Sequence, residues 1–274
     1  MKIWKNTSTL NGFDTGLNFI DSKSGADIVL MGSKPIEIDQ FLNLKGIFRA
    51  GIGRDNVPEK EAYDKGILVR YPSDKTASII FDETASFTCS LIFRMLFSNI
   101  GTIAPWMKTP REQMATKSLL VIGAGKIGSR VAELMRPFMQ VSTFDILQNE
   151  YFELKIMIQN VDCVTIHIPK SDNNISFFDK EKLSWMKDNS ILINAARGVI
   201  VDEDALYNEI SSGRLRAAFD VYWKEPYEGK LNEFYPERFF MTPHVASTCD
   251  GFIQGCRNDL DQFIDDINFQ VDGL

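Results

Sequence analysis

The stretch Leu119–Met135, which reads LLVIGAGKIGSRVAELM, decides the fold class. Its opening apolar run predicts a buried strand over residues 118–122, and apolar residues at helical spacing predict a helix over residues 126–136. The glycine-rich turn GAGKIG joins the two predicted elements. Because a strand that turns directly into a helix is the first half of a βαβ unit, this stretch predicts an α/β fold.

The glycine turn also predicts a dinucleotide site. Gly123 allows the tight turn, Gly125 lets the backbone approach a pyrophosphate, and Gly128 lets strand and helix pack closely. The following helix offers free N–H groups to the phosphates. Asp145 ends the next predicted strand, about 20 residues on, where a carboxylate binds the adenosine ribose, and no arginine follows it, which favours NAD over NADP. A turn needed only for packing and an S-adenosylmethionine site are the alternative interpretations.

The rest of the chain alternates strand and helix patterns at the spacing of doubly wound parallel sheets. Ahead of the turn we expect strands near 26–31, 46–50 and 66–70, a helix at 36–44 and a long buried helix at 82–100. After the turn the expected elements are strands 140–145, 163–168, 190–194, 217–220 and 239–242, helices 179–186 and 202–212, and a final helix.

Two domains follow from this pattern. Residues 101–117 carry two prolines, mixed polarity and no period, and are interpreted as a linker. We therefore expect a substrate (catalytic) domain at 1–100 and 248–274 and an NAD-binding domain at 101–247. The final helix is expected to return to the first domain.

Composition excludes several classes of function. The net charge of −7 offers no basic field for a nucleic acid. No apolar run is long enough to cross a membrane, and the first residues lack the apolar stretch of a signal peptide. Four separated cysteines and two histidines make a metal site improbable and favour a cytoplasmic protein.

Three polar residues beyond the glycine turn suit hydride transfer to a small oxo acid. Such a site needs a cation for the carboxylate and a proton donor that works near neutral pH. Arg197 and His244 each follow a predicted strand, at the edge where open α/β sheets bind ligands. Glu225 lies in the loop after another strand, where it would orient the imidazole and stabilise its protonated form. The other histidine, His167, alternates within a strand and precedes Pro169, and it is interpreted as structural or as a support of the site residues.

These segments together resemble the D-isomer-specific 2-hydroxyacid dehydrogenases, and among them the 3-phosphoglycerate dehydrogenases most closely. The resemblance runs from about Phe48 to Ser247. Its motifs, in chain order, are RAGIGRDNV (49–57), GAGKIG (123–128), HIP (167–169), NAARGVIVDEDAL (194–206), FDVYWKEP (219–226) and TPH (242–244).

The resemblance implies two Rossmann-like or flavodoxin-like α/β domains, with the cofactor domain inserted into a substrate domain that is shortened here. It implies Arg197, Glu225 and His244 as the catalytic residues, and a homodimer. It assigns NAD contacts to the glycine turn and to flanking residues, namely Gly123, Gly125, Lys126, Ile127, Gly128, Asp145, Ile168, Pro169, Ala195, Asp220 and Ile52. Substrate contacts are implied at Gly51 and Gly53 and, for a distal phosphate, at Arg54 and Lys34.

We therefore expect an NAD-dependent dehydrogenase that acts on a small (R)-2-hydroxy acid, with a 3-phosphoglycerate-like substrate favoured. One departure keeps the substrate open, because Val29–Lys34 lacks the arginine of the V-R-S-x-T segment that phosphoglycerate-using relatives tend to carry. The alternatives are a glyoxylate or hydroxypyruvate reductase and a non-catalytic, NAD(H)-sensing interaction protein. Neither a nucleic acid nor a membrane is expected as a partner.

Overall fold

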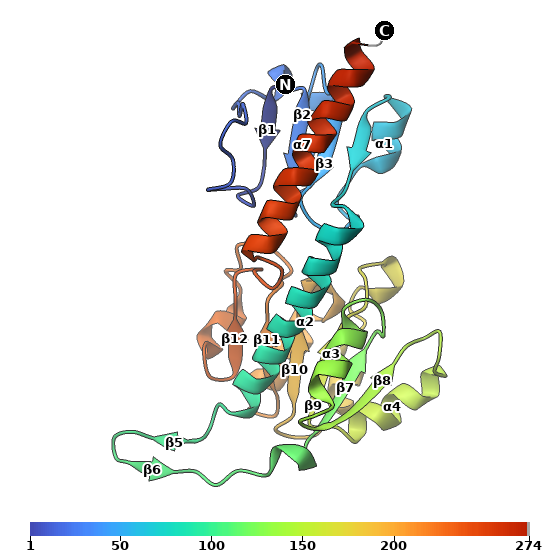
Figure 1. Cartoon of the computed structure of the whole chain (residues 1–274). Helices are drawn as coiled ribbons and strands as arrows, with labels where there is room; N and C mark the ends of the chain where they lie inside the picture. Colours follow the sequence, from blue (N-terminus) through green and yellow to red (C-terminus); the bar gives the residue numbers. More distant parts are fainter. Residues whose placement is uncertain (273–274) are drawn as a thin grey trace. The chain divides into compact units, whose positions relative to one another are not determined.

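The computed structural model describes residues 1–272, which form two compact units. One, here called the terminal unit, contains residues 1–80 and the chain from residue 247 onward. The other, the central unit, contains residues 81–246. Both are built on parallel sheets with helices, as Figure 1 shows, and the expected α/β fold class is confirmed. The helix α2 (Asp74–Leu96) belongs to both units, because the chain passes from one to the other within it.

The central unit contains a six-stranded parallel sheet in the order β12-β11-β10-β9-β7-β8. The strands are β7 (Ser118–Ile122), β8 (Gln140–Phe144), β9 (Cys163–Ile166), β10 (Ile191–Asn194), β11 (Arg216–Phe219) and β12 (Phe239–Met241). From β7 the chain crosses to β8 on one side and returns to β9 on the other. The carboxyl ends of β7 and β9 therefore form the topological switch point, where such sheets bind ligands.

Helices cover both faces of this sheet. The helices are α3 (Gly128–Met135), α4 (Tyr151–Gln159), α5 (Lys180–Trp185) and α6 (Glu203–Ser211), together with the second half of α2. Strand β7 shows how the faces divide: Leu119 and Val121 join the core with α2 and α3, whereas Leu120 and Ile122 join the core with α4, α5 and α6. Because both faces are buried, the strand is a continuous apolar run rather than an alternating one.

The terminal unit contains a four-stranded parallel sheet in the order β1-β2-β3-β4. Its strands are β1 (Ile3–Lys5), β2 (Ile28–Met31), β3 (Gly46–Arg49) and β4 (Leu68–Arg70). The long C-terminal helix α7 (Asp250–Asp272) packs on one face, where a Cβ at Gly46 would lie 2.6 Å from the Phe263 ring. The short helix α1 (Glu59–Asp64) contributes to the core of the other face.

Several local predictions were wrong. The helix expected at 36–44 is only a 3-10 turn, Ile38–Gln40; Ile38 and Phe41 are buried but Leu42 is 76% exposed, so the apolar residues of this segment do not share one helical face. Helix α2 begins at Asp74 rather than near 82. The expected linker contains a short hairpin, β5 (Gly101–Thr102) and β6 (Met107–Lys108), and neither β1 nor α4 was predicted.

Candidate active site

The glycine turn between β7 and α3 has three glycines with different surroundings. Gly123 adopts φ 93°, and a Cβ there would lie 2.7 Å from the carbonyl oxygen of His167. At Gly128 a Cβ would lie 1.9 Å from the carbonyl oxygen of Gly123. At Gly125, by contrast, an added Cβ would meet no atom within 4 Å. The fold therefore requires the first and third glycines, while the second leaves open space beside the turn, as close approach of a phosphate requires.

A pocket of about 390 Å³ opens at the carboxyl ends of β7, β8 and β9, the switch point of the sheet. It brings together five residues predicted to contact the cofactor, namely Gly123, Gly125, Asp145, Ile168 and Pro169. Its other walls were not predicted, and they include Ile146, Leu147, Tyr151, Asn174 and Phe177. Apolar and aromatic walls around one carboxylate suit an adenosine, with its flat base and its ribose diol.

Asp145 is held rigidly at the end of β8. Its Oδ2 accepts a hydrogen bond from the Ala124 backbone N–H at 2.8 Å, and its Oδ1 accepts one from the Leu147 N–H at 3.0 Å. Each oxygen retains a lone pair for a ribose hydroxyl. None of the described residues that line the pocket is lysine or arginine, so nothing there would neutralise a 2′-phosphate. The pocket therefore fits NAD.

His167 lies just past the end of β9, not within a strand as expected. Its Nε2 and the Thr165 hydroxyl form a hydrogen bond of 3.0 Å. Burial lowers the pKa of His167 to about 4, so the imidazole is neutral at physiological pH. It supports the turn, since its backbone oxygen lies against Gly123.

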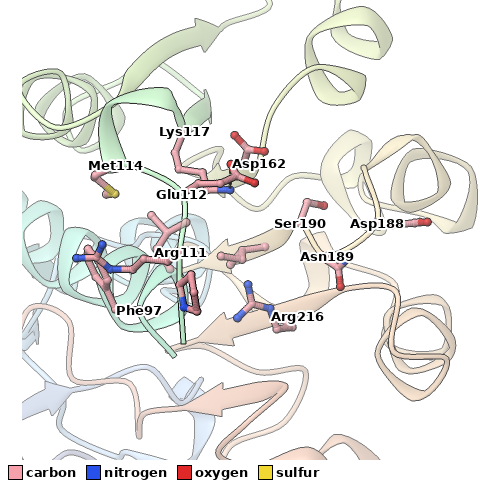
Figure 2. A pocket seen from close by; sticks show the side chains of 13 residues that line it. Phe97, Arg111, Glu112, Met114, Lys117, Asp162, Asp188, Asn189, Ser190 and Arg216 are labelled. Carbon is pink, nitrogen blue, oxygen red and sulfur yellow. Dashed lines mark hydrogen bonds and ion pairs between the residues drawn. The ribbon is translucent and has the colours of Figure 1, made fainter. Parts of the chain in front are cut away.

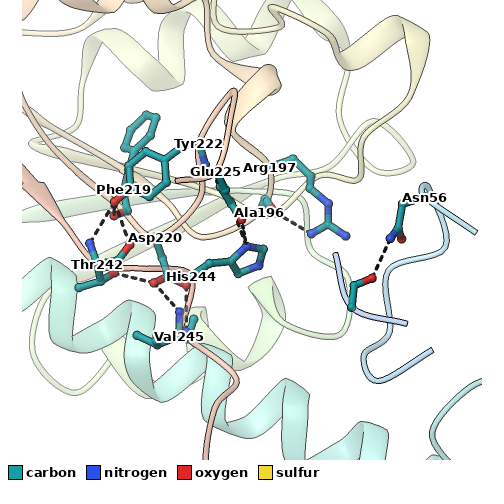
Figure 3. Close-up of polar contacts among 12 residues, drawn as sticks. Asn56, Ala196, Arg197, Phe219, Asp220, Tyr222, Glu225, Thr242, His244 and Val245 are labelled. Carbon is teal, nitrogen blue, oxygen red and sulfur yellow. Dashed lines mark hydrogen bonds and ion pairs between the residues drawn. The ribbon is translucent and has the colours of Figure 1, made fainter. Parts of the chain in front are cut away.

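His244 and Glu225 form a pair beyond the ends of β12 and β11. The imidazole Nδ1 lies 2.9 Å from Oε2 and 3.0 Å from Oε1 of the carboxylate, as Figure 3 shows. Because a carboxylate only accepts, Nδ1 carries the donated proton and Nε2 is left for a substrate. Burial alone would raise the pKa of Glu225, but the hydrogen bond and charge of His244 hold it below its usual value. The carboxylate is therefore ionised at neutral pH.

Asp220, at the end of β11, supports the loop that carries His244. Its buried carboxylate accepts hydrogen bonds from the Thr242 hydroxyl at 2.6 Å and from the N–H groups of Val245 and Ala246, both at 2.9 Å. His244 itself adopts φ 55°, a left-handed conformation that costs free energy in a non-glycine residue. Burial raises the pKa of Asp220, although the three donors act against this rise. Asp220 thus holds the strained loop in place.

Arg197 follows the end of β10. Its backbone carbonyl accepts a hydrogen bond from Asn194 Nδ2 at 2.9 Å, and its Nη1 donates to the Ala196 carbonyl at 2.8 Å. Ala195 lies in this turn, directly after the strand. The positive charge of Arg197 contributes to the low pKa of Glu225, so the two groups share one electrostatic environment.

Lys126 and Ile127 lie at the start of α3, outside the pocket lining. Lys126 is exposed, and its carbonyl accepts a hydrogen bond from Arg130 Nη1 at 2.6 Å. Ile127 is the N-cap residue of α3 and packs partly against the core with α2.

The substrate-side residues predicted from the sequence all lie in the terminal unit. Gly51, Ile52 and Gly53 form the loop after β3, and Ile52 packs against the core. Asn56 Nδ2 donates to the Gly32 carbonyl at 2.8 Å. This bond joins the loop after β3 to the loop after β2.

The two candidate phosphate ligands have different surroundings. Lys34 is exposed in the loop after β2. The Arg54 guanidinium lies 4.4 Å from the centre of the Tyr71 ring and 3.6 Å from Glu59. The positive charge of Arg54 is therefore already partly compensated by residues of the terminal unit.

Within residues 1–272 no group of three or more His, Cys, Asp or Glu side chains could hold a metal ion. No helix in the same part of the chain is long and apolar enough to cross a bilayer. The four cysteines are free.

Comparison with known proteins identifies the family. The model of the D-isomer specific 2-hydroxyacid dehydrogenase NAD binding domain matches residues 103–246. A hydroxypyruvate reductase of Thermotoga maritima is 30% identical over 243 residues, which cover 84% of this chain and 76% of that protein. A D-3-phosphoglycerate dehydrogenase of Archaeoglobus fulgidus is 30% identical over 220 residues, which cover 75% of this chain but only 42% of that protein.

The fold agrees with this assignment. The crystal structure of D-lactate dehydrogenase from Aquifex aeolicus, complexed with NAD and lactic acid, has a TM-score of 0.77 at 21% identity and covers 100% of this chain and 98% of that one. The family match includes more than half of this chain. The chain therefore belongs to the D-isomer specific 2-hydroxyacid dehydrogenase family, and it is an NAD-dependent oxidoreductase.

Proposed function

We propose that the chain reduces a small 2-oxo acid to the (R)-2-hydroxy acid, and catalyses the reverse reaction, with Arg197, Glu225 and His244 as its catalytic residues. The observation that carries this proposal is the contact between His244 Nδ1 and the Glu225 carboxylate at 2.9 Å. An imidazole held by a carboxylate on one nitrogen presents the other nitrogen as a general acid or base.

Each of the three residues has a distinct task. Arg197 binds the substrate carboxylate and polarises the adjoining carbonyl with its planar fork of donors. Protonated His244 donates a proton from Nε2 to the carbonyl oxygen during reduction, and neutral His244 accepts it back during oxidation. Ionised Glu225 stabilises the imidazolium. NAD, when bound, supplies the nicotinamide that donates or accepts the hydride.

The cofactor contacts follow from the same proposal. The central unit serves as the NAD-binding domain, with the adenosine in the pocket that Asp145 lines and the pyrophosphate at the turn of Gly125. The terminal unit serves as the substrate domain. Asp220 acts on the reaction by positioning the loop of His244, since its own oxygens already accept three hydrogen bonds.

Among substrates we propose hydroxypyruvate or glyoxylate ahead of a phosphorylated acid. The support is the environment of Arg54, whose guanidinium already contacts Glu59 and Tyr71. The exposed Lys34 favours phosphohydroxypyruvate, the oxo form of the 3-phosphoglycerate-like substrate expected from the sequence, as the second candidate. The relatives include both a hydroxypyruvate reductase and D-3-phosphoglycerate dehydrogenases.

The test of function combines a substrate screen with one variant. NADH oxidation is measured with glyoxylate, pyruvate, hydroxypyruvate and phosphohydroxypyruvate, and NADH binding is measured by fluorescence. His244→Ala is expected to abolish turnover of the preferred acid while NADH affinity stays within about twofold. A variant that retained its rate would refute the role of His244. A phosphohydroxypyruvate preference that disappears in Lys34→Met would instead support the second candidate.

We further propose that the chain forms a homodimer through the hairpin β5–β6. Its side chains Ile103 and Trp106 are 78% and 76% exposed, and in Figure 1 the hairpin extends away from the rest of the central unit. Exposed apolar side chains on so short a hairpin favour a protein interface. Light scattering after size-exclusion chromatography should give twice the chain mass for the wild type and a lower mass for Trp106→Ser. A monomeric wild type would exclude the dimer.

A further inference from the structure

A second cavity, of about 420 Å³, lies in the central unit at the amino ends of the strands. It is bordered by the first residues of β10 and β11, by the residue before β9 and by the segment 110–117 (Figure 2). The glycine turn and the catalytic residues lie at the opposite, carboxyl ends of the same strands. The cavity is therefore separate from the candidate active site, and its volume lies in the range of small-molecule sites.

The carboxylates of this cavity already have cationic partners. The pairs are Glu112 with Lys117 at 2.8 Å, Asp162 with Lys187 at 3.7 Å, and Asp188 with Arg214 at 3.8 Å. Asp162 also accepts hydrogen bonds from the backbone N–H and the hydroxyl of Ser118, both at 2.9 Å. These acids are thus neutralised by groups other than the arginine at the start of β11.

That arginine, Arg216, has no carboxylate partner among the described residues. Its Nη1 donates to the Met95 carbonyl at 3.0 Å and to the Ser98 hydroxyl at 2.5 Å. In the described part of the chain its Nε and Nη2 meet no acceptor, although the side chain is half-buried and lines the cavity. Burial lowers the pKa of Arg216 from its usual value, which indicates a cation whose lost hydration is not replaced by an opposite charge.

A second guanidinium lines the same cavity. Arg111 lies over the Phe97 ring, with 4.9 Å between the guanidinium carbon and the ring centre, and it makes no ion pair within residues 1–272. In Figure 2, Arg216 lies between the turn before β10 that carries Asn189 and the segment that carries Arg111. The cavity thus holds two guanidinium groups whose charge no carboxylate of the described chain offsets.

We propose that this cavity binds a small oxyanion of the phosphate or carboxylate class, with Arg216 as its principal ligand. The Nε and Nη2 edge of a guanidinium presents two parallel donors, a spacing that matches two oxygens of a phosphate or carboxylate. An oxyanion there supplies the missing opposite charge. If Arg216 served only to cap the C-terminal end of α2, Nη1 alone would be enough. That role would leave Nε, Nη2 and the cavity beside them unexplained.

The experiment measures binding of inorganic phosphate and of succinate by calorimetry, with sodium chloride at equal ionic strength as the reference. Saturating NADH is present throughout, and the titration is repeated in Arg197→Met, so that neither the dinucleotide site nor the catalytic arginine accounts for the heat. Binding of phosphate, succinate or both that persists in Arg197→Met is expected. The probe that binds more tightly identifies the oxyanion source.

Two variants then locate the site. Asn189→Asp adds a carboxylate to the lining at unchanged size and is expected to weaken binding at least tenfold, as is Arg216→Met. The matched control is Asn208→Asp, which makes the same charge change at an exposed position of α6 and should bind as the wild type does. Arg216→Met also removes the hydrogen bonds to the end of α2. If Arg216→Met fails to fold for that reason, the result for Asn189→Asp alone tests the proposal.

Two results would overturn the proposal: no binding of either probe above the chloride reference, or unchanged binding in Asn189→Asp. Both readouts are independent of turnover. They therefore test this cavity even if the proposed substrate is wrong.

Discussion

Glu225→Gln tests the proposed catalytic pair of Glu225 and His244 most directly, because it removes the charge of Glu225 and keeps its shape. The glutamine oxygen can still accept the hydrogen bond from His244 Nδ1, now at 2.9–3.0 Å from the carboxylate oxygens. The orientation of the imidazole is therefore retained, while the ionised partner of the imidazolium is lost. A change in rate then reports the charge of Glu225 rather than the position of His244.

The structure sets the size of the expected effect. A hydrogen bond to a charged group contributes about 1.5–3 kcal/mol, which corresponds to about 10- to 150-fold in rate. The side chains of His244 and Glu225 are 35% and 31% exposed, so solvent screens part of this interaction. We therefore expect the lower end, about a tenfold loss in kcat/KM for reduction at neutral pH.

The pH range in which the charge of Glu225 acts follows from the same contact. The pKa of Glu225 is held below its usual value, so the carboxylate is ionised and acts on His244 throughout the neutral range. The carboxylate is protonated only below this lowered pKa, so the loss of its charge in Glu225→Gln should reduce the rate of reduction throughout the neutral range.

The assay is NADH consumption with the preferred oxo acid from pH 5.5 to pH 9, with NADH affinity measured in parallel. An unchanged affinity shows that the variant is folded. A fall in kcat/KM of less than about threefold across this pH range would refute the proposed role of the Glu225 charge, since the carboxylate would then not act on the proton transfer.

Two further predictions concern the turn and the sheet. Gly128→Ala should lower the free energy of unfolding by at least about 3 kcal/mol, because its Cβ would lie 1.9 Å from the Gly123 oxygen. Gly125→Ala places a Cβ with no neighbour within 4 Å, so this variant should have the stability of the wild type. It should nevertheless bind NADH at least about tenfold more weakly. Urea unfolding and NADH titration of both variants check these two expectations. Equal losses of stability in the two variants would contradict them. Asp162→Asn should cost about 1–2 kcal/mol at pH 7, since burial would raise the pKa of Asp162 but its bonds from Ser118 hold it below the usual value. That stabilisation is present above the unfolded-state pKa of about 3.9 and is lost as the pH falls through the lower folded-state value. The free energies of unfolding of the wild type and Asp162→Asn, measured in urea, should therefore become equal at low pH.

The sequence predicted those parts of the fold that local chemistry specifies. The apolar runs of the sheet strands are readable because a strand buried on both faces has no polar positions to interrupt it. The turn at Gly123 is readable because backbone conformation and close packing exclude other residues there. Arg197, Glu225 and His244 were predicted because each follows a strand, and the structure brings Glu225 and His244 into contact.

Helix α4 was not predicted because apolar residues on its exposed face obscure its amphipathic pattern. Tyr151, Phe152 and Ile156 are 53%, 71% and 57% exposed, so apolar residues occur on the solvent side as well as at the buried Leu154 and Ile158. An amphipathic pattern cannot be read from such a segment. Its N-terminal signal was nevertheless present, in the capping box that Glu150 forms with the third helical residue. The helix also supplies Tyr151 to the proposed adenosine pocket, which explains one of the exposed aromatic groups.

The support of His244 lay beyond sequence reasoning for a different reason. A histidine after a strand can be read from the order of residues, but its φ of 55° and the three donors to Asp220 depend on how two strand ends meet. A strained residue persists only where the surrounding contacts fix it, and here the buried Asp220 carboxylate does so by binding the residues on either side of His244. Because that carboxylate is inaccessible, we propose that it acts on the reaction only through the position of His244. In this proposal two acids act on one histidine: Glu225 acts on its charge, and Asp220 acts on its conformation.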